Sequence, residues 1–156
     1  MNAEIKIPPC TNEKVPAPAV KFRHSHPLQT RFNDFDVFGH MNNTAYFSLL
    51  DLGKVNYYKA VLGDKFDFLQ IAVVIVNINI SFFSPAYFNE PLVVLTACEK
   101  LSVHSLILEQ RVVNPETGDV KCVARSVMAG FDIKNATGIE IPAEWARAIA
   151  DFENWD

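Results

Sequence analysis

Hydrophobic and polar residues alternate along much of the second half of the chain, and a period of two is typical of strands. The clearest example is residues 76–81, where Val-Asn-Ile-Asn-Ile-Ser places apolar side chains on one face and polar side chains on the other. This run lies inside a longer β-branched segment, residues 71–83. Further strands are predicted at residues 92–101, 103–113 and 120–133. The last two are separated by the turn sequence Asn114-Pro-Glu-Thr-Gly-Asp119.

Before these strands the apolar period changes to that of a helix. Across residues 45–61 apolar side chains recur at helical spacing, and Gly63 is expected to end the helix. Asn43 or Thr44 is expected to cap its start, because both are short polar residues. A second, short helix is predicted to begin at Pro142, since proline suits the first turn of a helix.

The beginning of the chain lacks this periodicity. Residues 1–26 contain closely spaced prolines, which disfavour regular structure. They are predicted to form an N-terminal extension that is partly ordered or packs on a neighbour. Residues 27–156 are predicted to form the folded domain, and residues 27–33 its first strand.

The resulting order is a strand, a long helix, a series of strands and a short helix. This order predicts an α+β architecture in which a sheet of about five antiparallel strands has one face covered by the long helix. The other face and the edges of the sheet need cover, and a second subunit would supply it. With 156 residues the chain has the length of one domain.

Composition narrows the possible partners. The formal net charge of −4 argues against nucleic acid. The longest apolar run, residues 71–76, is too short to span a bilayer, and residues 1–9 do not resemble a secretory signal, so no membrane partner is expected. The three cysteines are widely spaced, which fits neither a disulfide framework nor a metal site and indicates a reducing, cytoplasmic setting. The twelve phenylalanines suit an apolar pocket or a subunit interface as well as a core.

One segment, from Arg31 to Tyr46, concentrates polar residues between the first predicted strand and the long helix. Backbone N–H groups at a helix start bind developing negative charge. A nearby carboxylate or imidazole supplies a nucleophile or a base. The chain has no P-loop, no dinucleotide fingerprint, no Gly-x-Ser-x-Gly motif and no metal-ligand spacing, so neither a cofactor nor a metal is expected.

The pattern Asp-x-Asp-x-x-Gly-His-x-Asn-Asn-x-x-Tyr at residues 34–46 carries a family resemblance. It is accompanied by Ser81-Phe-Phe-Ser-Pro-Ala, His104-Ser-Leu-Ile-Leu-Glu-Gln, Thr117-Gly-Asp-Val and Phe131-Asp132. Over residues 28–153 the chain resembles the hotdog-fold acyl-CoA thioesterases of the 4-hydroxybenzoyl-CoA thioesterase-like group, with a kinship to plant acyl-carrier-protein thioesterases. The resemblance implies an antiparallel sheet wrapped around a central helix, a dimer or a dimer of dimers, and active sites between subunits.

Within this resemblance Asp36 matches the family carboxylate that attacks the thioester carbonyl or activates water. The alternative is that Asp36 only caps the turn, a common role of aspartate. Tyr46 is expected to line the acyl pocket and to offer its backbone N–H to the carbonyl oxygen. His40 matches a catalytic histidine of the plant-type enzymes. Those enzymes carry an asparagine two residues earlier, where this chain has Phe38, so catalysis, substrate binding and a structural role stay open for His40.

Other residues are expected to shape the site or to contact substrate. Gly39 is predicted to adopt a positive φ or to allow close approach of the ligand. Asn42 and Asn43 are expected to cap the helix or to form a hydrogen bond across the subunit interface. Asp51 matches an acidic position of the same helix, where a plain surface role is the alternative. Two serines lie in strands that resemble the partner-facing part of the site: Ser81 and Ser105.

The sequence therefore predicts a cytoplasmic thioesterase, assembled as a homodimer or homotetramer. It would hydrolyse an acyl-CoA or acyl-carrier-protein thioester with Asp36 as nucleophile or general base and without a cofactor. Three cations are considered for the adenosine diphosphate end of coenzyme A: Lys121, Arg125 and Lys134. A non-catalytic acyl-thioester-binding hotdog protein is the alternative, which Phe38 supports. A hotdog dehydratase is disfavoured because the chain shows no Asp/His pair on a longer hydration loop.

Overall fold

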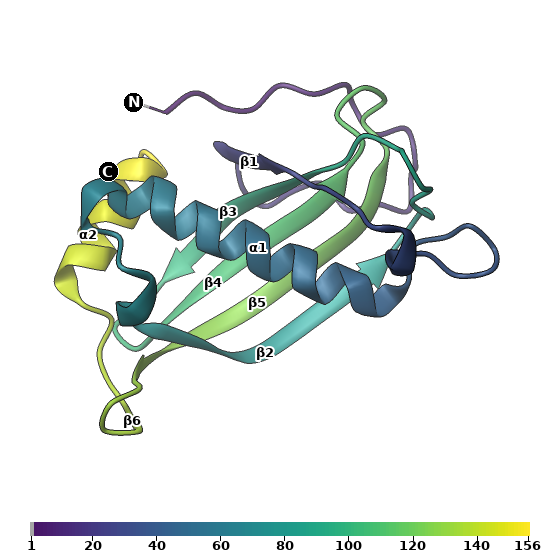
Figure 1. Cartoon of the computed structure of the whole chain (residues 1–156). Helices are drawn as coiled ribbons and strands as arrows, with labels where there is room; N and C mark the ends of the chain where they lie inside the picture. The colour runs from purple at the N-terminus through teal and green to yellow at the C-terminus, as the bar shows by residue number, and fades with distance from the viewer. Residues whose placement is uncertain (1) are drawn as a thin grey trace.

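The computed structural model describes residues 2–156 and shows an antiparallel sheet with one long helix lying across one face (Figure 1). The main sheet consists of β1 (His24–Pro27), β2 (Val73–Phe82), β3 (Val93–Leu101), β4 (Ser105–Val113) and β5 (Val120–Asp132). Their spatial order is β1-β3-β4-β5-β2. The helices are α1 (Asn43–Leu62) and α2 (Ala143–Phe152). The predicted α+β fold is thereby confirmed.

Several short elements complete the fold. The short strand β6 (Thr137–Gly138) pairs with the end of β5. Residues 2–156 also include the 3-10 helices η1 (Phe32–Asp34), η2 (Gly63–Lys65) and η3 (Phe68–Gln70). The sequence did not predict these elements, because each is too short to show a hydrophobic period.

The first strand lies earlier than predicted. The sequence places it at residues 27–33, whereas β1 pairs with β3 from His24 to Pro27. The chain leaves the sheet because Asp34 closes the η1 turn. Its carboxylate accepts a hydrogen bond from the backbone N–H of Arg31 at 2.7 Å and lies 3.0 Å from the Arg31 guanidinium. The strand prediction is therefore wrong in position, and regular structure begins inside the predicted extension.

Helix α1 lies unusually close to the sheet at Gly53. A Cβ atom added to Gly53 would lie 2.8 Å from Val94 Cγ1 on β3 and 2.9 Å from Gln110 Nε2 on β4. Gln110 is fully buried, and its Nε2 donates a hydrogen bond to the Leu50 carbonyl at 3.0 Å. A buried amide thus ties the middle of α1 to the centre of the sheet, which fixes where the two ends of the helix lie.

An N-terminal arm, residues 2–23, crosses the face of the sheet opposite α1 (Figure 1). Its apolar side chains pack against Leu95 and Val113, which alternate with the strand residues that face the helix. Gly118, with φ of +78°, lets the Pro8 carbonyl approach the turn between β4 and β5. The arm therefore packs on its own sheet.

Both ends of the described chain lie beside α2 (Figure 1). The Asn2 side-chain amide donates to the Phe152 carbonyl at 3.2 Å, and the Asn154 amide donates to the Asn2 carbonyl at 3.2 Å. In Figure 1 the loop before α1 projects from the opposite end of the molecule.

Candidate active site

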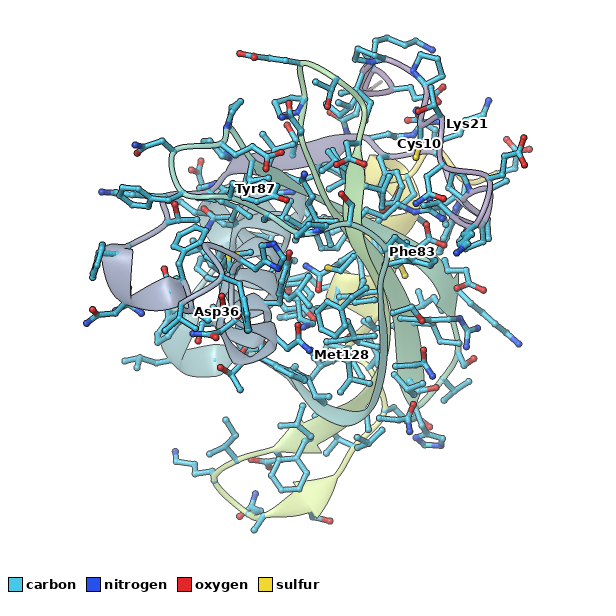
Figure 2. All side chains as sticks on the ribbon, turned by 90° about the vertical axis from the view of Figure 1, so that its right-hand side faces the viewer. Cys10, Lys21, Asp36, Phe83, Tyr87 and Met128 are labelled. Atoms are coloured by element: carbon cyan, nitrogen blue, oxygen red, sulfur yellow. The ribbon has the colours of Figure 1, made fainter. Side chains whose placement is uncertain are left out.

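A cavity of about 520 Å³ lies at the N-terminal end of α1. Figure 2 views this end of the molecule, with Asp36 on the projecting loop and Phe83 just after β2. Three segments form the walls: the loop before the helix, the first turn of α1, and the end of β2 with the residues that follow. The lining residues are Asp36, His40, Met41, Asn42, Asn43, Thr44, Tyr46, Phe82, Phe83, Ser84 and Pro85.

The loop that carries Asp36 is a tight turn. The Asp36 N–H donates to the His40 carbonyl at 2.9 Å, and the Gly39 N–H donates to the Asp36 carbonyl at 3.0 Å. Gly39 has φ of +74°, while a Cβ atom there would meet nothing within 4 Å. Of the two reasons that the sequence offered for this glycine, the positive φ is the one that the structure shows.

The Asp36 carboxylate is oriented by backbone donors. Its Oδ1 accepts hydrogen bonds from the N–H groups of Phe38 at 2.9 Å and His40 at 3.2 Å. Oδ2 has no hydrogen-bond partner among the residues that the structure describes. Asp36 is exposed and lines the cavity. Oδ1 of Asp36 therefore caps the turn, and Oδ2 remains available for chemistry in the cavity.

Helix α1 begins without a side-chain cap. Asn42, one of the two asparagines expected to cap the helix, occupies the N-cap position, but its side chain forms no capping hydrogen bond. The N–H groups of Asn43 and Thr44 have no acceptor within residues 2–156. Both residues line the cavity. The positive end of a long helix therefore presents free donors to the cavity, an arrangement that binds anions and developing oxyanions.

The hydrogen bonds at the start of α1 bear on which N–H groups can serve as the oxyanion donor. Tyr46 is the fourth residue of α1, a position whose N–H in an ideal helix donates to the carbonyl four residues earlier. The free N–H groups are those of Asn43 and Thr44, one turn earlier. The sequence placed the start of the helix two residues too late, and the role expected of the Tyr46 N–H stays a prediction.

Tyr46 is a buried residue that lines the cavity, only 2% exposed. Its ring contacts Phe82 edge to face, with 5.2 Å between ring centroids. Burial, together with the nearby Cys122 thiol and the Glu90 and Asp119 carboxylates, raises the pKa of Tyr46 above its ordinary value. The phenol therefore stays neutral at physiological pH and contributes an apolar surface with one hydroxyl group.

His40 joins the loop to the segment after β2. Its backbone pairs with that of Tyr87, and the two rings pack edge to face with centroids 5.3 Å apart. The imidazole forms no side-chain hydrogen bond within the described part of the chain, although it lines the cavity. Its backbone, not its ring, contacts the Asp36 carboxylate.

Four predicted residues do not line the cavity of a single chain: Gly39, in the turn described above, and Asp51, Ser81 and Ser105. The Asp51 side chain is 63% exposed and lies 3.4 Å from the Lys54 ammonium. Ser81 pairs with Val123 on β5, one residue before the strand end that borders the cavity. Ser105 begins β4 beside Ala129, towards the other end of the sheet. Their roles remain predictions.

The sequence did not identify the wall formed by Phe82, Phe83 and Pro85, although these residues lie in the stretch that carries the family resemblance. It also suggested Lys121 and Arg125 as surface cations for substrate. Lys121 is 3% exposed and ion-paired, and the Arg125 guanidinium is bound to Glu99. The Lys121 ammonium is therefore not a surface cation, whereas the Arg125 side chain is 52% exposed and Lys134 is exposed, so their roles stay predictions.

The fold and cavity define a class of protein: an α+β hotdog protein with an acidic residue and an uncapped helix start at one site. Residues 30–149 match the model of the thioesterase-like superfamily. The chain therefore belongs to that superfamily, and the predicted family and fold are confirmed. No helix of residues 2–156 is both long and apolar enough to cross a membrane.

Individual relatives agree with this assignment. The long-chain acyl-CoA thioesterase FadM of Escherichia coli K12 is 27% identical over 120 residues, which cover 75% of this chain and 89% of FadM. A thioesterase from Thermus thermophilus, solved with coenzyme A and zinc, superposes with a TM-score of 0.76 at 19% identity and covers 86% of this chain and 97% of its own. A 4-hydroxybenzoyl-CoA thioesterase variant, solved with 4-hydroxybenzoyl-CoA, gives a TM-score of 0.72 at 20% identity, covering 81% and 97%. The predicted enzyme class, thioester hydrolase, agrees with these names.

Proposed function

We propose that this protein hydrolyses acyl-CoA thioesters at the cavity before α1. The observation that carries the proposal is that Asp36 and the free N–H groups of Asn43 and Thr44 line one cavity. A thioesterase needs both an ionised acid and donors aimed at the carbonyl oxygen. The named relatives act on or bind coenzyme A compounds, which supports the substrate class.

In the proposed reaction the thioester oxygen accepts hydrogen bonds from the N–H groups of Asn43 and Thr44. The free oxygen of Asp36 then attacks the carbonyl carbon, or removes a proton from a water molecule that attacks it. The tetrahedral intermediate collapses as the carbon–sulfur bond breaks, and the thiolate of coenzyme A leaves and takes up a proton. Direct attack leaves an anhydride with Asp36, which a water molecule hydrolyses. Both routes release a carboxylic acid and free thiol.

The acyl part of the substrate is proposed to lie against Tyr46, Phe82 and Phe83, the aromatic residues of the cavity. Leu49 and Leu50, which follow Tyr46 on α1, are buried in the core with exposures of 8% and 0%. The apolar groups near the reacting carbonyl thus come from both the helix and the end of β2. Carrier-protein thioesters would present the same reacting group.

A homodimer is proposed on the basis of β2. This strand is the outer strand of the sheet, and its exposed apolar residues include Val76 at 60% and Phe82 at 41%. A long apolar edge is a template for another strand, and pairing of two β2 strands would build one continuous sheet with two-fold symmetry. Because Phe82 lines the cavity, the partner would close it. Val76→Asp should yield monomers by light scattering, whereas Val103→Asp, at an equally exposed site in the β3–β4 turn, should not.

The experiment that tests the function is hydrolysis of a panel of aromatic, short and long acyl-CoAs by the purified protein. Asp36→Asn should remove the activity. Asp67→Asn is a matched control, because the Asp67 carboxylate likewise accepts a backbone N–H two residues ahead, from Leu69 at 2.9 Å, but far from the cavity. Full activity of Asp36→Asn would contradict the mechanism.

Two further outcomes separate the alternatives. Tight acyl-CoA binding without turnover would identify a non-catalytic binding protein, the alternative that Phe38 raised. Faster turnover of carrier-protein thioesters than of acyl-CoAs would change the substrate class and leave the site intact. A cytoplasmic location is proposed from the free state of Cys10, Cys98 and Cys122, since oxidising compartments favour disulfides.

A further inference from the structure

An ion cluster around the buried ammonium of Lys121 lies directly behind the cavity wall. The Lys121 side chain is only 3% exposed, and its ammonium lies 2.6 Å from Glu90 Oε2 and 2.7 Å from Asp119 Oδ2. It also donates a hydrogen bond to the Pro85 carbonyl at 3.1 Å. An ammonium has three donors, and these contacts use all of them. Lys121 therefore connects β5, the turn before it and the segment that follows β2.

Stability alone gives little reason for a buried ammonium in this cluster. A buried ion pair loses much of its Coulombic gain to desolvation, and an apolar residue of similar size often serves stability as well or better. Burial lowers the pKa of Lys121, but the hydrogen bonds to Asp119 and Glu90 outweigh burial and hold the pKa above its ordinary value. The ammonium is thus charged and fixed. Such a group specifies one conformation of the segments that it binds.

The segment held by Lys121 contacts the loop that carries Asp36 at two points. The Ala86 carbonyl, next to Pro85, accepts a hydrogen bond from the Met41 N–H at 2.8 Å. Tyr87 pairs with His40 through its backbone and its ring. Met41 directly precedes the N-cap of α1. A continuous path of short contacts therefore runs from the Lys121 ammonium to the uncapped helix start.

Glu90 strengthens the same path. One of its carboxylate oxygens meets Lys121, and the other accepts the Tyr87 N–H at 3.1 Å. The Asn114 side-chain amide donates to Glu90 at 3.0 Å. Glu90 thus binds Lys121 and the backbone of the residue that packs on His40. The Glu90 carboxylate and the Lys121 ammonium thus both hold the segment after β2 that contacts the Asp36 loop.

We infer that Lys121 is a positioning residue for the active site. Its ammonium fixes residues 83–91, and through Ala86 and Tyr87 that segment fixes the Asp36 loop and the free N–H groups of α1. Its effect on catalysis rests on the proposed function, whereas its effect on the loop does not. Lys121 does not touch substrate and acts only through the residues that it holds.

The test compares Lys121→Met with Arg111→Met. Arg111 is a matched control because it is also a buried cation, 6% exposed, paired with a carboxylate two residues earlier in the chain, Glu109 at 3.0 Å. It lies on the face of the sheet that the arm covers and does not line the cavity at the start of α1. The two variants remove the same kind of group from two places.

Amide hydrogen exchange of residues 35–46 is measured first, because it requires no substrate. Lys121→Met should accelerate exchange in this segment about tenfold, and Arg111→Met should leave it unchanged. In acyl-CoA hydrolysis Lys121→Met should lower kcat about tenfold with little change in KM, because the donors become misplaced by a fraction of an ångström. Lys121→Arg, which keeps the charge, should recover most of kcat.

Equal exchange in wild type and Lys121→Met, or equal acceleration by Arg111→Met, would overturn the inference. If Lys121→Met does not fold, Glu90→Gln provides the same comparison, since it weakens the cluster while keeping the size of the side chain. A wild-type protein without thioesterase activity would contradict the proposed function, and the exchange result would still decide the role of Lys121.

Discussion

The polar groups near the two ends of helix α1 differ in whether the protein supplies their hydrogen-bond partners. At the C-terminal end Gly63 caps the helix and its N–H donates to the Lys59 carbonyl. Nearby, one Glu153 oxygen accepts hydrogen bonds from the Tyr57 hydroxyl at 2.7 Å and the Cys98 N–H at 2.8 Å. At the N-terminal end the helix has no side-chain cap, and the Asp36 Oδ2 has no partner within residues 2–156. One end of the helix is completed by the fold, and the other is left open to a ligand.

The contrast suggests that polar groups near the C-terminal end of α1 serve stability, whereas those at its N-terminal end serve function. A carboxylate that bridges buried donors strengthens the fold, because those donors would otherwise lose their hydrogen bonds. A carboxylate with a free oxygen beside free N–H groups contributes little to the fold and is available to a substrate. The two ends should therefore respond differently to matched substitutions.

The largest effect is expected for Asp36→Asn. Acyl-CoA hydrolysis should fall about 10²–10⁴-fold, because an amide is neither a nucleophile nor a base. The free energy of unfolding should change by less than about 1 kcal/mol, since Asn still offers an oxygen to the turn. Kinetics and urea unfolding of the same preparation provide both numbers. A large loss of stability would show that Asp36 serves the fold.

Glu153→Ala should have the opposite profile. It leaves the Tyr57 hydroxyl and the Cys98 N–H without their shared acceptor, so the free energy of unfolding should fall by about 2–4 kcal/mol. The kcat of the remaining folded enzyme should be unchanged. Glu153→Gln keeps an acceptor and should lose less. A kcat that falls with Glu153→Ala would mean that the two ends of the helix are coupled.

The C-terminal half of the helix should also make stability depend on pH. His24 packs edge to face on Tyr57 at 5.9 Å, and burial, with the nearby charge of His26, lowers the pKa of His24 from 6.5 to about 4. The unfolded chain therefore binds a proton at a pH where the folded protein does not, which favours unfolding. Between pH 6.5 and about 4 the wild-type protein should lose stability relative to His24→Phe. If the free energy of unfolding changed with pH in the same way in both proteins, the prediction for His24 would be contradicted.

The smallest effects are expected from a pair of glycines, one at each end. Gly39 has φ of +74° and Gly63 has φ of +57°, and a Cβ atom would meet nothing within 4 Å at either position. Alanine at each site should cost about 1 kcal/mol of stability through backbone strain alone. Only Gly39→Ala should also lower kcat, because it distorts the turn that presents Asp36. Thermal unfolding and kinetics of both variants test the pair.

Part of the candidate site was predictable because its residues lie in one stretch of sequence. Asp36, His40, Asn42, Asn43 and Tyr46 are close in the chain, so a turn followed by a helix brings them together without long-range contacts. The hydrophobic periods of two and 3.6 residues likewise identified the long helix and the main strands.

The remainder depends on tertiary contacts. The first strand ends early because Asp34 binds Arg31, and no periodicity reports that turn. Lys121 looked like a surface cation, as most lysines are, until the fold brought Glu90 and Asp119 to it. The start of α1 was placed two residues late because helix boundaries are uncertain by one or two residues, and one turn decides which N–H groups are free.

The two ends of the described chain lie close together beside α2, and this has a practical consequence. Asn2 is hydrogen-bonded to Phe152 and Asn154, and Figure 1 shows both ends of the described chain away from the projecting loop. A tag, a fluorophore or a solid support attached at either end would stand clear of the cavity mouth. The short separation also suits a circular permutant in which a brief linker joins the two ends and new termini open elsewhere.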